Sequence, residues 1–152
     1  MKKLATLGLM ADSGCHIALL DLHEDLLNIL GKVQLVHSYI LMDTKLIPKN
    51  VDVMVVEGGI RTEHDVEMVK TARKRSKVLV ALGSCACFGG IPSLCNLFNS
   101  GEAFKYVYSR TVSTDKYSSL PREIVPPITE SVAPISSYVK VDVGIPGCPP
   151  PS

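Results

Sequence analysis

Residues 51–85 read VDVMVVEGGIRTEHDVEMVKTARKRSKVLVALGSC, and the fold class follows from their pattern. Continuous apolar runs at 51–56 and 78–82 predict two fully buried strands. Between them, the segment Thr62-Glu63-His64-Asp65 resembles a capping box and opens a predicted helix that runs to about Arg75. A buried strand, a helix and a second buried strand form a β-α-β unit, which predicts a parallel sheet.

The same alternation extends on both sides of this unit. Residues 4–10 predict a strand, and 17–30 predict a helix that stops at Gly31. Residues 34–42 predict a further strand, and 138–145 predict the last one. The whole order predicts an α/β fold with a doubly wound parallel sheet.

Length and composition favour one globular domain over 1–152, with a long irregular surface excursion at 99–134 where the pattern becomes turn-rich. A net charge of +1 and only 5% aromatic residues argue against a nucleic-acid partner. No apolar stretch approaches the roughly 18 residues that span a bilayer, so we expect a cytoplasmic protein with no direct membrane span. Five cysteines, an odd number, favour a metal site in a reducing compartment over a disulfide framework.

Three cysteines lie beside glycine in loops that follow predicted strands. Cys15 follows the first strand, Cys85 the fourth and Cys148 the last, while Glu57 ends the third. Open parallel sheets bind ligands at the carboxyl ends of their strands, so we expect these side chains to gather at one edge. Iron-sulfur clusters are bound by thiolates on backbone that approaches closely, as the adjacent glycines allow.

Asp12 lies three residues before Cys15, where a Cys-x-x-Cys pattern would place a fourth cysteine. It is either a fourth ligand or the cap of the following helix. The predicted metal ligands are Asp12, Cys15, Cys85 and Cys148. The residues expected to contact the cofactor are Ser13, Gly14, Glu57, Gly58 and Gly147.

Several alternatives stay open at this stage. Zinc suits the widely separated ligands less well than a cluster does, because structural zinc sites use two close-spaced pairs. Cys95 is expected to pack among Leu94, Leu97 and Phe98, and Cys87 is expected to pack or to form a redox pair with its neighbour. Other readings are a flavin-phosphate site after the first strand, and a cluster-free interaction subunit whose basic segment 70–77 docks a partner. His16 is either a satisfied residue at a helix start or a hydrogen-bond donor to a cluster sulfur.

Four segments together resemble the small subunit of nickel-iron hydrogenases. They are DSGCH at 12–16, VEGGI at 56–60, GSCACFGGIP at 83–92 and PGCPP at 146–150, in the family's order. The likeness is greatest to the gamma subunits of deazaflavin-reducing and viologen-reducing hydrogenases of methanogens, to which LMDTK at 41–45 adds. It implies a flavodoxin-like fold with helices on both faces of the sheet.

The resemblance also implies a function. We expect an electron-transfer subunit with one proximal four-iron four-sulfur cluster, beside a nickel-iron centre in a large partner subunit. Cys15, Cys85 and Cys148 match three of the family's cluster ligands, and Asp12 replaces the fourth. We expect a further iron-sulfur or flavin subunit as electron acceptor, and no catalytic residue in this chain. The related quinone-reducing small subunit of respiratory complex I is the alternative, although its tandem cysteines are replaced by Gly14-Cys15.

The methanogen subunits continue into a ferredoxin-like region with further cysteines, which is absent from this sequence. Clusters further along the electron path are then expected to lie on another chain, to be lacking, or to be missing because this sequence is a fragment of a longer one. The final acceptor and the direction of electron flow do not follow from the sequence.

Overall fold

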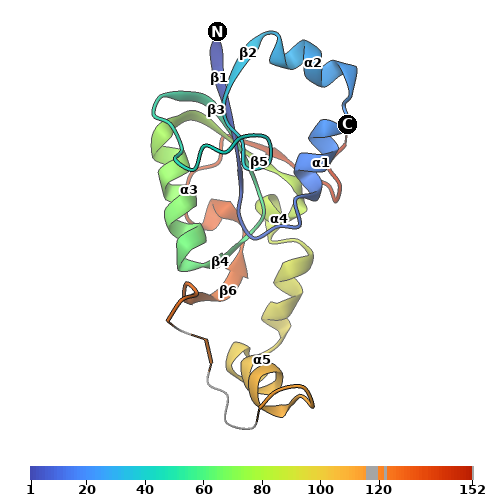
Figure 1. Cartoon of the computed structure of the whole chain (residues 1–152), viewed down its shortest axis with the longest axis vertical. Coiled ribbons are helices and arrows are strands. Elements are labelled where there is room, and N and C mark those ends of the chain that lie inside the picture. The colour runs from blue at the N-terminus through green and yellow to red at the C-terminus, as the bar shows by residue number, and fades with distance from the viewer. Residues whose placement is uncertain (116–119, 122, 152) are drawn as a thin grey trace.

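The computed structural model describes residues 1–115, 120–121 and 123–151. Its main sheet is parallel, and Figure 1 shows it running through the centre of the molecule. The spatial order of its strands is β2 (Val33–His37), β1 (Lys2–Gly8), β3 (Val51–Glu57), β5 (Ser76–Leu82) and β7 (Val143–Ile145). This is the flavodoxin-like order, in which β2 is added on one side of β1 and all later strands of the sheet are added on the other side. The predicted α/β fold class is confirmed.

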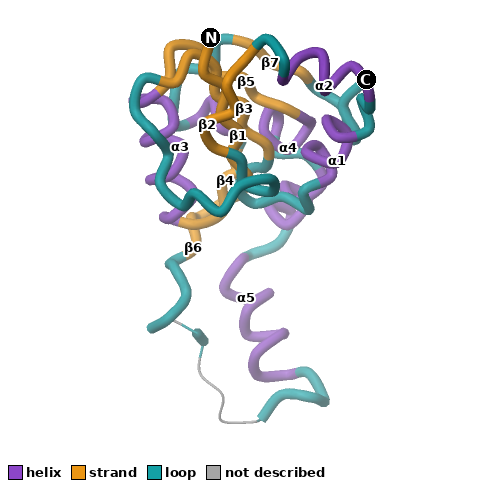
Figure 2. Tube along the Cα trace, turned by 45° about the horizontal axis from the view of Figure 1, so that its top comes forward, coloured by secondary structure: helices purple, strands orange, loops and turns teal. Residues whose placement is uncertain are grey.

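Helices cover both faces of this sheet. Helix α3 (Glu63–Arg75) lies on one face, and α1 (Gly14–Leu20) and α4 (Gly83–Phe88) lie on the other, as Figures 1 and 2 both show. The capping box at the start of α3 is confirmed: the Thr62 hydroxyl accepts from Asp65 N, and the Asp65 carboxylate accepts from Thr62 N at 2.8 Å. These contacts are local in sequence, which explains why the pattern alone predicted them.

The central strands supply most of the core. Strand β3 pairs with β1 on one side and β5 on the other, so its apolar side chains are buried on both faces. Largest among the fully buried apolar side chains are Met54, Ile60, Leu79, Ile135, Val51, Val56 and Val69. This packing holds the carboxyl ends of β1, β3 and β5 level with one another.

Three predicted elements are shorter than expected. The helix predicted over 17–30 is two helices, α1 and α2 (Glu24–Leu30), because His23 adopts φ 49° and interrupts the hydrogen bonding. The strand predicted over 34–42 ends at His37, since the Ser38 hydroxyl accepts from Leu41 N and forms a turn.

The third shortened element is the last strand. Only Val143–Ile145 of the strand predicted over 138–145 pairs with β5. The 3-10 helix η3 (Ile135–Ser137) precedes it, and the amides of Tyr138 and Val139 both donate to the Ile135 carbonyl. These local turns compete with extension of the strand.

The described parts of the segment 99–134 include an arm that extends away from the sheet and carries α5 (Ser100–Lys105), as Figure 2 shows. The segment also carries the π-helical turn η2 (Tyr106–Arg110) and β6 (Ile128–Ala133). Strand β6 pairs antiparallel with β4 (Ile60–Thr62) and ties the arm back to the domain. The one-domain organisation over 1–152 stays a prediction.

Candidate metal centre

Three cysteine loops meet at the carboxyl edge of the main sheet. Ser84 N, after β5, donates to the Gly147 carbonyl at 2.9 Å, and Gly147 N donates to the Ser84 hydroxyl at 3.2 Å. This pair of hydrogen bonds joins the loop of Cys85 to the loop of Cys148. The Cys15 loop reaches the same place, because the Cys15 sulfur lies beside the Cα of Gly83.

The loops surround a cavity of about 540 Å³. Its lining includes Asp12, Cys15, Cys85 and Cys148, the four residues that the sequence predicted as metal ligands. Gly14, Gly58 and Gly147 also line it, as expected of residues near a cofactor. Of the remaining predicted contacts, Glu57 lies behind the Cys15 loop, and Ser13 precedes α1 with φ 66°.

Two glycines leave room for the sulfurs of the site. A Cβ on Gly83 would lie 2.3 Å from Cys15 Sγ, and a Cβ on Gly90 would lie 2.7 Å from Cys85 Sγ. Both residues also have positive φ, at 84° and 58°. A side chain at either position would therefore displace a thiol from the cavity. Thiols set into glycine loops around an open cavity match the donor set and backbone approach that an iron-sulfur cluster requires.

The protein environment raises the pKa of two of the thiols at this cavity. Burial, followed by the charge of Glu57, raises the pKa of the Cys15 thiol to about 12. Burial, followed by the charge of Cys148, also raises the pKa of Cys85. A bound metal deprotonates a coordinating thiol outright, so the positive charge of iron would offset these effects. The same raised pKa values disfavour Cys85 and Cys87 as a nucleophilic redox pair, which needs a thiolate.

Asp12 lines the cavity with only one oxygen engaged in a hydrogen bond. Its Oδ1 accepts from Gly14 N at 2.9 Å, which stabilises the start of α1. No other hydrogen bond to this carboxylate is present within the described residues. The helix-start role and the ligand role are therefore compatible in geometry, because they use different oxygens. The same contact occupies one of the backbone amides after β1 that could otherwise bind a flavin phosphate.

Glu57 and His16 form a buried pair behind the Cys15 loop. Glu57 is 0% exposed, and its Oε1 lies 2.5 Å from His16 Nδ1. Its Oε2 accepts from Cys15 N at 3.0 Å and from His16 N at 3.2 Å. The sequence placed Glu57 near the site but did not reveal this partner, because the two residues are 41 positions apart.

The other cysteines lie outside the site. The Cys87 sulfur donates to the Ala81 carbonyl at 3.5 Å and packs against the core, as one of its two readings expected. The packing expected for Cys95 is wrong: this residue is exposed. Within the described ranges, no three His, Cys, Asp or Glu side chains converge as they would around a single metal ion.

The basic segment at the end of α3 is engaged within the domain. Arg73 binds Asp142 at 2.5 Å, Arg75 donates to the Ile47 carbonyl, and Lys77 pairs with Asp52 at 2.8 Å. These contacts account for three of the charges that the docking-patch reading used. They stabilise the end of the sheet that lies far from the cysteine loops.

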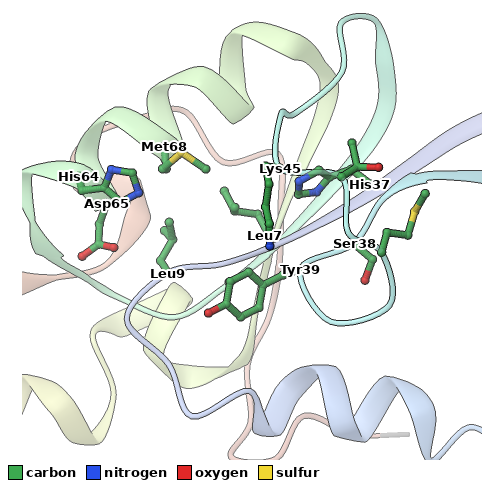
Figure 3. A pocket seen from close by; sticks show the side chains of 12 residues that line it. Leu7, Leu9, His37, Ser38, Tyr39, Lys45, His64, Asp65 and Met68 are labelled. Atoms are coloured by element: carbon green, nitrogen blue, oxygen red, sulfur yellow. The ribbon is translucent and has the colours of Figure 1, made fainter.

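A second pocket lies on the α3 face of the sheet, away from the cysteines. Figure 3 shows it between α3, which contributes His64, Asp65 and Met68, and the end of β2 with the segment after it. His37 is the last residue of β2, and Tyr39 and Lys45 follow it. Its volume is about 190 Å³. The LMDTK segment contributes Met42, Thr44 and Lys45 to this lining, so it is not part of the cysteine cavity.

The helices of the described residues include none that is long and apolar enough to cross a membrane.

Known proteins resemble this chain over nearly all of its length. Residues 13–152 match the family described as NADH ubiquinone oxidoreductase, 20 Kd subunit. A subunit of the F420-non-reducing hydrogenase vhu of Methanocaldococcus jannaschii is 48% identical over 148 residues, which is 97% of this chain and 51% of that protein. The delta subunit of the NAD-reducing hydrogenase HoxS of Cupriavidus necator is 38% identical, over 97% of this chain and 72% of that protein.

A solved structure agrees with these sequence matches. A chain in the structure of an NAD+-reducing [NiFe]-hydrogenase in the H2-reduced state superposes with a TM-score of 0.91 at 31% identity, covering 98% of this chain and 84% of that one. The chain spans about half the length of the methanogen relatives it matches. The family resemblance seen in the sequence motifs is confirmed, and the chain belongs to the 20 kDa subunit family of NADH ubiquinone oxidoreductase, in its nickel-iron hydrogenase small-subunit branch.

Proposed function

We propose that this chain is the electron-transfer small subunit of a nickel-iron hydrogenase and binds one four-iron four-sulfur cluster. The observation that carries the proposal is the meeting of Cys15, Cys85 and Cys148 at one cavity, with glycines at the points where the thiols come closest to backbone. The relatives support it, since one from Archaeoglobus profundus is named as an iron-sulfur subunit of a hydrogenase.

Each residue of the site has a definite role in this proposal. The thiolates of Cys15, Cys85 and Cys148 would hold the cluster, and the Asp12 carboxylate, whose Oδ2 accepts no hydrogen bond among the described residues, would be the fourth ligand. When bound, the cluster accepts and releases single electrons. The chain contributes rigid placement: the Ser84 and Gly147 hydrogen bonds hold two ligand loops together. In this proposal, the reaction with hydrogen takes place in the large partner subunit.

An exposed apolar surface next to the cavity suits the large subunit of the hydrogenase. Ile91 lines the cavity and is also 70% exposed, so the cavity opens directly onto this surface. The other exposed large apolar side chains here belong to the end of α4 and to the 3-10 helix η1 (Ile91–Leu97) with the residue after it, namely Phe88, Leu94, Leu97 and Phe98. A patch of this kind marks a protein interface. It would bring the cluster close to a nickel-iron centre in the partner.

Further subunits complete the proposed electron path. An iron-sulfur or flavin subunit would act as acceptor beyond the cluster, because the described cavity has ligands for one cluster only. We also propose that the complex works in the cytoplasm. The names of the relatives connect it with methanogens and with NAD-linked hydrogenases.

The ligand assignment is tested by iron content. The complex is purified under anaerobic conditions, and iron is measured per complex for Cys15→Ser, Cys85→Ser and Cys148→Ser. We expect each variant to lose most of the iron of this cluster, because a serine hydroxyl is a poor replacement for a thiolate. Cys95→Ser is the matched control and should retain wild-type iron. Wild-type protein without iron, or equal iron in Cys15→Ser and the control, would refute the proposal.

The role of Asp12 has its own test. Asp12→Ala should lower the iron-to-protein ratio, and Asp12→Cys should restore or raise it by supplying a fourth thiolate. Asp12→Asn keeps an oxygen that can accept from Gly14 N but lacks the charge of a carboxylate ligand. If Asp12→Ala and Asp12→Asn both keep full iron, Asp12 serves only the start of α1.

The family's description favours a second candidate, a small subunit of a quinone-reducing complex I-like enzyme. Both candidates use a cluster in this cavity, so iron alone does not separate them. Nickel does: the hydrogenase proposal expects nickel in the large partner chain, and hydrogen-dependent reduction of a viologen dye by the complex. Iron without nickel in an intact complex would favour the second candidate.

A further inference from the structure

The imidazole of His16 is buried and has one polar contact. The residue is 5% exposed, and its Nδ1 lies 2.5 Å from Glu57 Oε1. Its Nε2 is buried with no hydrogen-bond partner among the described residues. Burying a ring nitrogen without a hydrogen-bond partner costs free energy. At His16 this cost falls on Nε2, whereas Nδ1 makes a hydrogen bond with Glu57.

Glu57 links this contact to the cysteine loop. Its carboxylate receives three hydrogen bonds, from Cys15 N, His16 N and His16 Nδ1, and all three donors belong to the start of α1. The carboxylate itself is at the carboxyl end of β3, in the middle of the sheet. Glu57 therefore joins the backbone of Cys15 to the most rigid part of the core.

The other side of the His16 ring is apolar. His16 lines a cavity of about 110 Å³ whose walls include Leu19, Leu20 and Leu26. The centroids of the His16 and Tyr39 rings are 6.4 Å apart. A leucine would suit this side of the residue as well as a histidine does. Only the contact with Glu57 requires a donor at this position.

We propose that His16 is a positioning residue for the cluster ligand Cys15. By donating from Nδ1, it holds the Glu57 carboxylate in the orientation that also accepts from the Cys15 and His16 amides. The Cys15 sulfur is thereby fixed beside Gly83, opposite Cys85 and Cys148. The inference rests on the proposed function only in naming Cys15 as a cluster ligand.

The test compares two replacements of His16 with a matched buried histidine. His16→Asn keeps a nitrogen donor near the position of Nδ1, whereas His16→Leu keeps apolar bulk and removes the donor. His37→Leu is the control, because His37 is 4% exposed and its Nδ1 bonds a backbone carbonyl, that of Thr6, at 2.9 Å. The purified complex is used throughout.

Two readouts report the position of Cys15. The first is the EPR spectrum and midpoint potential of the reduced cluster in the complex. The second is the alkylation rate of Cys15 by iodoacetamide, divided by that of Cys95, in the full chain after iron removal. We expect His16→Leu to change the EPR spectrum and midpoint potential of the cluster, and to raise the Cys15/Cys95 alkylation ratio at least threefold. His16→Asn and His37→Leu should stay close to wild type in both.

The inference is overturned if His16→Leu matches wild type in both readouts, or if His16→Asn departs from wild type as far as His16→Leu does. If His16→Leu does not fold, His16→Gln replaces it, since its amide lies further from Glu57; it should show the same changes, and a wild-type alkylation ratio would overturn the inference. A wild-type complex without iron refutes the proposed function instead, and the alkylation ratio then decides on His16 alone.

Discussion

The two ends of strand β3 carry acidic side chains in opposite environments. Asp52, near the start, pairs with Lys77 Nζ at 2.8 Å, and the Lys77 side chain is 70% exposed. Glu57, at the other end, is 0% exposed and is bound by His16 and two backbone amides. Water reaches Lys77, the charged partner of Asp52, whereas His16, the side-chain partner of Glu57, is only 5% exposed. The comparison teaches that the amino end of the sheet uses a carboxylate in a salt bridge with an exposed lysine, whereas the carboxyl end uses one to hold the start of α1, which carries Cys15.

The largest effect is expected at the buried end. Glu57→Gln removes the charge that three donors share, and leaves those donors buried without a full partner. Breaking a buried pair in this way costs about 3 kcal/mol or more of the free energy of unfolding. Chemical denaturation of the purified chain measures it. If Glu57→Gln lowers the free energy of unfolding no more than Asp52→Asn does, the carboxylates at the two ends of β3 contribute equally to stability.

A glycine of the carboxyl edge should be nearly as sensitive. Gly83→Ala places a Cβ 2.3 Å from Cys15 Sγ at a residue with φ 84°. We expect a loss of about 2 kcal/mol from strain and overpacking, together with lower iron content. In Gly144→Ala, the matched control on β7, the Cβ would lie at an ordinary 3.6 Å from Cys87 Sγ. Equal thermal stability and iron in the two variants would contradict the close fit at Gly83.

Asp142 provides an intermediate case at the β5–β7 junction. Its carboxylate accepts from Leu79 N and from Arg73, and these contacts, the backbone one first, hold the pKa of Asp142 below its ordinary value of 3.8. A lowered pKa stabilises the fold above the ordinary value, and the effect is lost as pH falls through the folded value. Asp142→Asn should therefore unfold at lower denaturant than wild type at neutral pH, with the gap closing in acid. A gap that is constant with pH would exclude the charge as its cause.

The smallest effect is expected for Asp52→Asn at the exposed end. The hydrogen bond from Lys77, followed by that from Lys3 N, lowers the pKa of Asp52 to about 2. Its contribution is present above pH 3.8 and disappears as pH falls towards 2. Because water and salt screen this pair, 1 M salt should remove most of the difference at neutral pH. The Glu57→Gln difference, being buried, should persist in the same salt.

Predictions from sequence succeeded where the determinants are local. Apolar runs identified β3 and β5, and the Thr62 capping box lies within four residues. They were wrong where a local turn interrupts an apolar pattern that continues beyond it. His23 interrupts a continuous helical periodicity, and the Ser38 turn ends β2 although apolar residues continue to Met42.

In the candidate site, too, some features were predicted from the sequence and others were not. Its four proposed ligands were identified from strand ends and glycine neighbours, and all four line the cavity. His16 was left with two readings, and its contact with Glu57 at the start of α1 agrees with the satisfied histidine for Nδ1, although the sequence did not name the partner. Nothing in the pattern around His16 signals a partner 41 residues away, so only the register of β1 against β3 could reveal it.

The sequence by itself determined the order of strands and helices, because hydrophobic periodicity and capping act over a few residues. That order was enough to place Asp12, Glu57, Cys85 and Cys148 at one edge of the sheet. Tertiary structure alone decided how closely the loops approach, which glycines make room for sulfur, and which donors bind Glu57. These contacts join residues that are distant in sequence, and their geometry depends on how the strands pack in the core.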